Sequence, residues 1–111
     1  MRINSQEKQE IELLKNCLVE SLSPAKIYLF GSFAEGKQQA DSDFDFYVVM
    51  QDSTSERILN LTVKAYKAIK DMRTRAVDII VNKEGRFNSR KNLKLTVESE
   101  VANKGVLLYG E

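Results

Sequence analysis

Histidine is absent from this 111-residue sequence, cysteine occurs once, and there is no long apolar run. Without histidine, histidine-based triads and imidazole zinc sites are excluded, so any acid–base catalysis falls to carboxylates. The single Cys17 precludes an internal disulfide and agrees with a reducing compartment. No segment approaches the roughly 20 apolar residues that span a bilayer, and the N-terminus lacks a signal-peptide pattern. These absences predict a cytoplasmic protein that does not contact membranes.

Length and charge predict one small domain. A hydrophobic fraction of 42% over residues 1–111 is sufficient for a single core, and the length is too short for two domains. The net charge of +1 gives little general attraction to a phosphate backbone. We therefore expect no direct binding to nucleic acid.

Helices and strands are predicted to alternate along the chain without repeats or a linker. The helix signals are a cap at Asn4 or Ser5 with a stop at Pro24, a capping box of Ser53 and Glu56, and a run from about Ser89 towards a C′ residue at Gly105. The expected fold class is α/β (α+β), with a small mixed β-sheet of about four strands covered by about four helices.

A Gly-Ser pair follows the first predicted strand, at 26–30. Gly31 and Ser32 stand where this strand would pass into a short helix. Free backbone N–H groups and the helix dipole at such a position favour an anion, such as the phosphate of a nucleotide. Taken alone, the pair is more often an ordinary turn or cap.

Three aspartates lie on the next two predicted strands. Asp43 and Asp45 are two residues apart, so they project from the same face of one strand with Cα atoms roughly 6.5 Å apart. Asp78 interrupts a run of β-branched residues at 75–81, and a carboxylate there needs a partner or a cation. Alone, Asp43 and Asp45 could equally line the solvent face of an edge strand. Together, the three predict a centre that binds divalent cations.

The segments 31–36, 42–45 and 77–79, together with 103–109 near the C-terminus, resemble the minimal nucleotidyltransferases of the polymerase-β-like superfamily. The resemblance implies that Gly31 and Ser32 hold a nucleoside triphosphate. It also implies that Asp43, Asp45 and Asp78 bind two Mg²⁺ ions and that Asp78 helps to activate an acceptor hydroxyl. ATP would be the substrate.

The short segment after the Gly-Ser pair departs from the family pattern. Family members often carry basic residues there, whereas this sequence has Phe33 and Glu35. Lys37, just beyond Gly36, is the nearest cation that can contact a triphosphate, although it lacks the planar fork of arginine.

The resemblance also implies a partner. Free-standing domains of this family are commonly antitoxins that attach AMP to a tyrosine of a HEPN-type ribonuclease toxin, which gives the first hypothesis and implies a hetero-oligomer. The first alternative is nucleotidyl transfer to a small-molecule hydroxyl, such as that of an aminoglycoside. The second is a non-catalytic inhibitor that covers its partner's active site.

Overall fold

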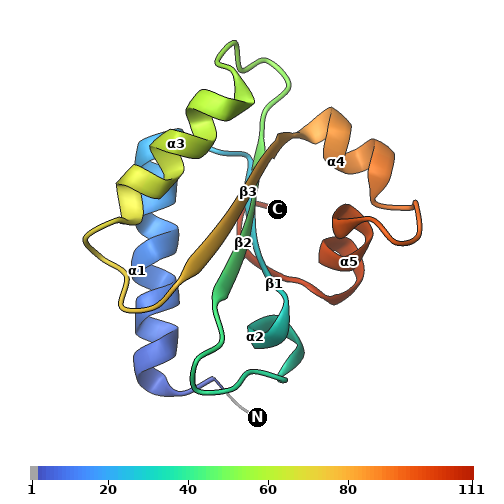
Figure 1. The fold of residues 1–111 in the computed structure, drawn as a ribbon. Helices are drawn as coiled ribbons and strands as arrows, with labels where there is room; N and C mark the ends of the chain where they lie inside the picture. Colours follow the sequence, from blue (N-terminus) through green and yellow to red (C-terminus); the bar gives the residue numbers. More distant parts are fainter. Residues whose placement is uncertain (1–2) are drawn as a thin grey trace.

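The computed structural model describes residues 3–111 and shows a four-stranded sheet with helices on both faces (Figure 1). In chain order, the described elements are α1 (Ser5–Leu22), β1 (Lys26–Phe30), α2 (Ser32–Glu35), β2 (Phe44–Met50), α3 (Ile58–Ile69), β3 (Val77–Lys83), α4 (Glu84–Arg90), α5 (Val97–Lys104) and β4 (Val106–Tyr109). The strand order is β3-β2-β1-β4. Strands β2 and β3 are parallel, whereas β1 is antiparallel to β2 and β4. The predicted mixed sheet is therefore confirmed.

The first helix begins and ends where the sequence predicts. The Asn4 side chain accepts a hydrogen bond from the Glu7 backbone N–H at 2.8 Å, and the Glu7 side chain accepts one from the Asn4 N–H at 2.9 Å. This reciprocal pair is a capping box. At the other end, Ser23 has a φ of 50° in the left-handed region, and Pro24 follows. The apolar face that α1 buries against the sheet consists of Ile11, Leu14, Leu18 and Leu22.

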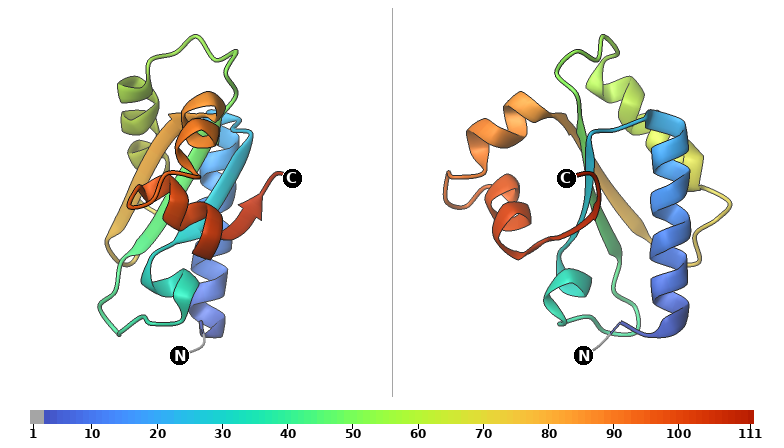
Figure 2. Two further views of the ribbon diagram at one scale, coloured as in Figure 1. Left: turned by 90° about the vertical axis from the view of Figure 1, so that its right-hand side faces the viewer. Right: turned by 180° about the vertical axis from the view of Figure 1, so that it is seen from behind.

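Side-chain alternation along β2 divides the molecule into two layers of helix around the sheet. Phe44, Phe46 and Val48 are fully buried in the main core, as predicted, together with apolar side chains of α1 and α3. Tyr47 and Val49 belong to a smaller cluster with residues of α4 and α5. Figure 2 shows the sheet between these two pairs of helices. Residues of β2 with odd numbers, including Asp45, consequently face the α4 and α5 side.

Two helix boundaries differ from prediction. The capping box predicted at Ser53 and Glu56 is absent, because α3 begins only at Ile58 and a turn closed by a Thr54 N–H to Gln51 oxygen bond of 3.1 Å precedes it. The single last helix is instead two helices, so the described chain has five rather than about four. Leu95, with a φ of 69°, lies in the break between them.

Both ends of α5 are determined by local contacts, and the first of them follows the break at Leu95. Thr96 caps α5 by accepting a hydrogen bond from the Ser99 N–H at 3.0 Å. Gly105 follows the last helical residue but has a φ of −76°, so it is an extended cap rather than the left-handed C′ glycine that was predicted. A Cβ at Gly105 would lie 2.5 Å from the Val101 carbonyl oxygen. The glycine is needed for space rather than for a positive φ.

None of the helices within residues 3–111 combines the length and apolar character required to cross a membrane.

Candidate functional site

Two of the predicted carboxylates lie side by side on neighbouring strands. Asp45 of β2 and Asp78 of β3 are partners in the parallel register, and Phe30 of β1 is the partner of Asp45 on its other side. Both aspartates project to the sheet face that carries α4 and α5. The Asp45 side chain is half-buried, whereas Asp78 is exposed at the edge strand. The structure therefore brings these two acids together, with Asp78 accessible from outside.

Asp43 joins them from the loop that enters β2. The sequence pattern predicted Asp43 on the strand. The strand begins only at Phe44, so Asp43 lies just before it. The loop is closed by a hydrogen bond from the Gln39 N–H to the Ser42 hydroxyl at 2.8 Å. Arg75 also fixes the loop, because its guanidinium donates a hydrogen bond to the Ser42 carbonyl at 3.1 Å.

The neighbouring carboxylates change the pKa of Asp45. Burial raises the pKa of Asp45, and the neighbouring Asp78 and then Asp43 raise it further, to about 6. Asp78 also shares a side-chain hydrogen bond with Asp45, and Glu100 of α5 adds a smaller effect of the same sign. Like charges at one place disfavour ionisation of the most buried member. A divalent cation would reverse this penalty.

The donor set fits Mg²⁺, which prefers carboxylate oxygens and retains several waters. Asp43, Asp45 and Asp78 would hold the ion, with Asp45 at the centre because both other carboxylates act on it. In their present side-chain positions, no three Asp, Glu or Cys groups among residues 3–111 converge tightly enough to surround an ion. An exposed Asp78 on an edge strand has the freedom to close such a site.

The Gly-Ser turn lies directly against this group of acids. Gly31 has a φ of 75°, and a Cβ built on it would lie 2.2 Å from the Asp45 Oδ2 atom. Any larger residue would displace the carboxylate or the turn. Ser32 begins α2, a single turn whose end is closed by the Lys37 N–H bonding to the Ser32 carbonyl at 2.9 Å. Glycine is thus required here by both backbone conformation and close contact.

The structure explains the two unusual residues of α2. Phe33 is buried and contacts Phe44 edge to face, with ring centroids 4.7 Å apart. The Arg75 guanidinium lies over both rings, 5.0 Å from the Phe33 centroid and 4.8 Å from that of Phe44. Phe33 therefore anchors the turn to the core. Its own side chain is uncharged, so α2 has no basic residue at this point in the sequence.

Glu35 instead attracts two lysines. The Lys37 Nζ atom lies 3.4 Å from Glu35 Oε1, and the Lys104 Nζ atom lies 3.8 Å from the same oxygen. Lys37 is evident in the sequence as the cation just beyond Gly36, whereas Lys104, which belongs to α5, is not. No sequence signal pairs them, because only the packing of α5 beside β1 brings Lys104 to α2.

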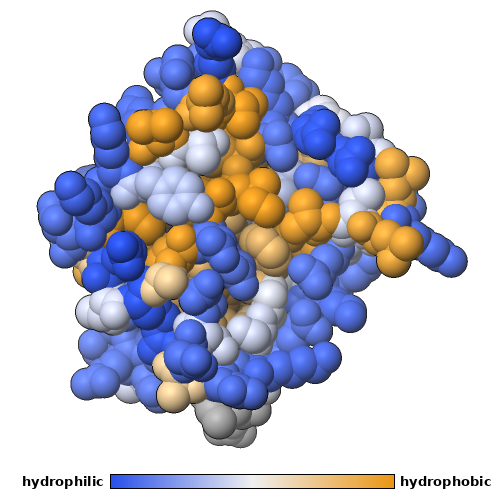
Figure 3. Space-filling model, in the orientation of Figure 1, coloured by the Kyte–Doolittle hydropathy of each residue, from blue (hydrophilic) through white to orange (hydrophobic). Residues whose placement is uncertain are grey.

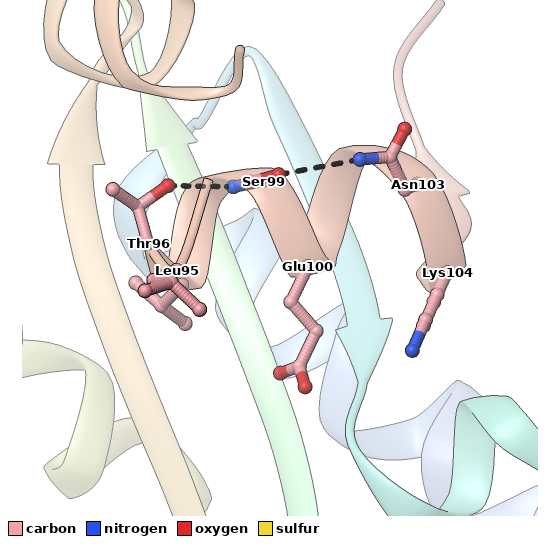
Figure 4. A pocket seen from close by; sticks show the side chains of 7 residues that line it. Leu95, Thr96, Ser99, Glu100, Asn103 and Lys104 are labelled. Atoms are coloured by element: carbon pink, nitrogen blue, oxygen red, sulfur yellow. Dashed lines mark hydrogen bonds between the residues drawn. The ribbon is translucent and has the colours of Figure 1, made fainter. Parts of the chain in front are cut away.

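A groove of about 430 Å³ runs along α5 (Figure 4). Glu100 and Lys104 extend from one side of the helix, while Thr96, Ser99 and Asn103 are joined by hydrogen bonds along another side. Its lining consists of Leu95, Thr96, Val97, Ser99, Glu100, Asn103 and Lys104. Because Glu100 acts on the pKa of Asp45, the groove neighbours the carboxylates.

A mixed sheet that sets clustered carboxylates against a tight Gly-Ser turn is the arrangement of a nucleotidyl-transferring domain. The chain belongs to the nucleotidyltransferase domain family, whose model matches residues 11–107. This agrees with the nucleotidyltransferase resemblance that the sequence predicted.

Solved structures share this fold. A candidate nucleotidyltransferase from Sulfolobus solfataricus superposes with a TM-score of 0.60 at 18% identity, covering 93% of this chain and 79% of that chain. A toxin–antitoxin structure with AMP-PNP gives a TM-score of 0.53 at 26% identity, covering 92% and 73%. A mutant of the MntA–HepT toxin–antitoxin gives 0.53 at 23% identity, with the same coverage. No curated protein matches the sequence significantly.

Proposed function

We propose that this protein is an antitoxin that transfers AMP from ATP to a hydroxyl, most simply a tyrosine, of a HEPN-type ribonuclease toxin. The observation that carries the proposal is the contact between the Gly31 turn and Asp45, which sets a phosphate-binding position directly against carboxylates on two strands. The similarity to a toxin–antitoxin structure with AMP-PNP, at 26% identity, supports both the nucleotide and the partner. A cytoplasmic location, where ATP is available, forms part of the proposal.

Each residue of the site has a chemical task in this proposal. Backbone N–H groups of the Gly31–Ser32 turn orient the triphosphate, and Asp43, Asp45 and Asp78 hold Mg²⁺. When bound, Mg²⁺ neutralises the charge that develops on the phosphate oxygens. The acceptor oxygen forms a bond to the α-phosphorus while the bond to the bridging oxygen breaks, and pyrophosphate leaves. Asp78 is the exposed carboxylate, so it accepts the proton of the hydroxyl.

A macromolecular acceptor fits the open architecture of the site. Asp78 lies on an edge strand, and the groove along α5 is lined by a single helix and the loop before it. Large apolar side chains are also exposed on α3, with Leu59, Val63 and Tyr66 at 69%, 47% and 40%. Apolar residues interrupt the hydrophilic surface over much of the face in Figure 3. Such a surface suits a protein partner.

The test uses the purified protein with Mg²⁺, labelled ATP and a HEPN-type toxin as the acceptor. Label is expected on the toxin. Asp45→Asn and Asp78→Asn should each lower the labelling rate by about a hundredfold or more, because these groups act together on the transition state. Asp71→Asn, an exposed acid in the loop after α3, is the matched control and should label normally. Labelling by Asp45→Asn at the wild-type rate would contradict the assignment of the metal site.

The same material separates the competing functions. A toxin that is labelled and then freed of this protein should remain inactive as a ribonuclease, because a covalent AMP persists after dissociation. Full activity with an unchanged intact mass would favour a non-catalytic inhibitor. Transfer to aminoglycosides, with none to the toxin, would favour the small-molecule function.

A further inference from the structure

The Gly-Ser turn lacks the positive charge that a triphosphate requires. Within α2, Phe33 is buried in the core and Glu35 is the only charged side chain. Glu35 would repel the phosphates of a nucleotide if it stood alone. A triphosphate bound here therefore needs a cation supplied from elsewhere in the fold.

The structure brings such a cation from α5. The Lys104 Nζ atom lies 3.8 Å from Glu35 Oε1, so the last residue of α5 reaches the turn that follows β1. Lys104 also lines the 430 Å³ groove, together with Glu100 one helical turn earlier. Figure 4 shows both side chains extending from the same side of α5. Lys104 consequently stands between the groove and α2.

Two lysines sharing one carboxylate leave one positive charge in excess. Lys37 is the nearer partner of Glu35, at 3.4 Å, and its side chain is 74% exposed. The Lys104 pair is longer, and Lys104 alone of the two lines the groove. Lys104 can therefore turn to a phosphate while Lys37 continues to neutralise Glu35. Its mobility costs little, because its side chain is 61% exposed and its ion pair is weak.

We propose that Lys104 is the cation that binds the triphosphate of the nucleotide, taking the place of the basic residues that α2 lacks. The proposal rests on the proposed function, since it concerns the same nucleotide. Lys37 neutralises Glu35 and does not contact the phosphates. Lys104 distinguishes ATP from AMP, because the β- and γ-phosphates carry most of the ligand's negative charge.

The test is calorimetric titration of the isolated protein with ATP and with AMP, both in Mg²⁺. Lys104→Ala should weaken ATP binding by about tenfold, the loss expected for one charge-assisted hydrogen bond in a partly exposed position. AMP binding should change by less than about twofold, because that ligand lacks the contact. Lys104→Arg should retain most of the affinity for ATP, since it keeps the charge.

The matched control is Lys94→Ala, which removes the same charge from an exposed position in the loop between α4 and α5. It should bind ATP as the wild type does. Equal affinities of wild type and Lys104→Ala for ATP would overturn the proposal for Lys104 and leave the proposed function intact. A larger loss in Lys37→Ala than in Lys104→Ala would assign the contact to Lys37 instead. No ATP binding by the wild-type protein would overturn both proposals.

Thermal melting of each variant without nucleotide shows whether the fold is retained. Lys104 is the last residue of α5 and is exposed, so we expect its variants to melt close to the wild type. If Lys104→Ala were destabilised, Lys104→Arg would still decide the outcome, because the proposal requires ATP binding to follow charge at this position.

Discussion

Asp45 is the residue on which the site depends most. Its carboxylate touches the Gly31 turn, pairs in register with Asp78 and lies near Asp43 and Glu100. Its pKa of about 6, against an ordinary value of 3.8, means that the folded protein without a cation disfavours the charged form. The protein thus keeps an unfavourable charge arrangement whose advantage appears only when a cation binds.

The pH dependence of stability should reveal this arrangement. An acid whose pKa is raised by folding binds its proton more tightly in the folded state, so the free energy of unfolding falls as pH rises from about 4 to 6. In EDTA, we expect Asp45→Asn to remove that fall. Above pH 6 the variant should exceed the wild type by about 1–2 kcal/mol, a value discounted for partial exposure. Urea unfolding at several pH values measures the difference, with Asp71→Asn as control; parallel curves for wild type and Asp45→Asn would be the contrary result.

At the scale of elements, a buried carboxylate ties α4 and α5 to the sheet. Glu98 of α5 is only 2% exposed and accepts hydrogen bonds from the Tyr47 hydroxyl at 2.7 Å and from Arg90 at 3.1 Å. Asn82 of β3 donates to the Tyr47 hydroxyl at 3.2 Å. Burial alone would raise the pKa of Glu98, but the hydrogen bonds from Tyr47, its own backbone and Arg90 lower it. The network therefore fixes α5, and with it Lys104, over the sheet.

Removing Glu98 should be costly. Glu98→Ala would leave Arg90 and the Tyr47 hydroxyl without their shared partner, so we expect a loss of about 2–3 kcal/mol in the free energy of unfolding. Because the pKa of Glu98 is lowered, its contribution should be full at neutral pH and vanish as pH falls through the folded pKa. Urea unfolding at pH 7 tests this, with the exposed Glu20→Ala of α1 as the control. A loss no larger than that of the control would show that the network contributes little.

At the scale of the whole molecule, the site depends on segments far apart in the chain. The turn after β1, the start of β2, β3 and the helix α5 meet on one face of the sheet, while α1 and α3 cover the other (Figures 1 and 2). A ligand that contacts all of these segments binds the folded chain and has no comparable site on the unfolded one. Binding should consequently stabilise the entire domain.

Melting with and without ligand tests this linkage. In EDTA, we expect Asp78→Asn to melt at the same temperature as the wild type or higher, because it relieves repulsion with Asp45. Mg²⁺ and ATP at a hundredfold excess over the dissociation constant should stabilise the wild type by about 2.7 kcal/mol and reverse the order. Differential scanning calorimetry gives both temperatures. If Asp78→Asn melted well below the wild type in EDTA and ligands changed nothing, Asp78 would be a structural residue.

The sequence by itself determined the elements whose signals are local. The Asn4 cap, the strand at 26–30 and the alternation of Phe44, Phe46 and Val48 depend on neighbouring residues and on burial patterns, and the structure has all three. The class of protein was also predicted from the sequence, through the resemblance of segments 31–36, 42–45 and 77–79 to a known family, and the family match over residues 11–107 agrees. The break at Leu95 could not be predicted in this way, since no glycine or proline marks it.

Only the tertiary structure decided which distant side chains share the site. The approach of Gly31 to Asp45 and the register of Asp45 with Asp78 result from strand pairing, which places residues 33 positions apart beside each other. The arrival of Lys104 at Glu35 follows from the packing of α5 beside β1, which no local pattern encodes. Local interactions join residues that are close in the chain, so the spacing of those residues in the sequence predicts them. The charges around a binding site act through space, so their balance exists only once the sheet and α5 have packed together.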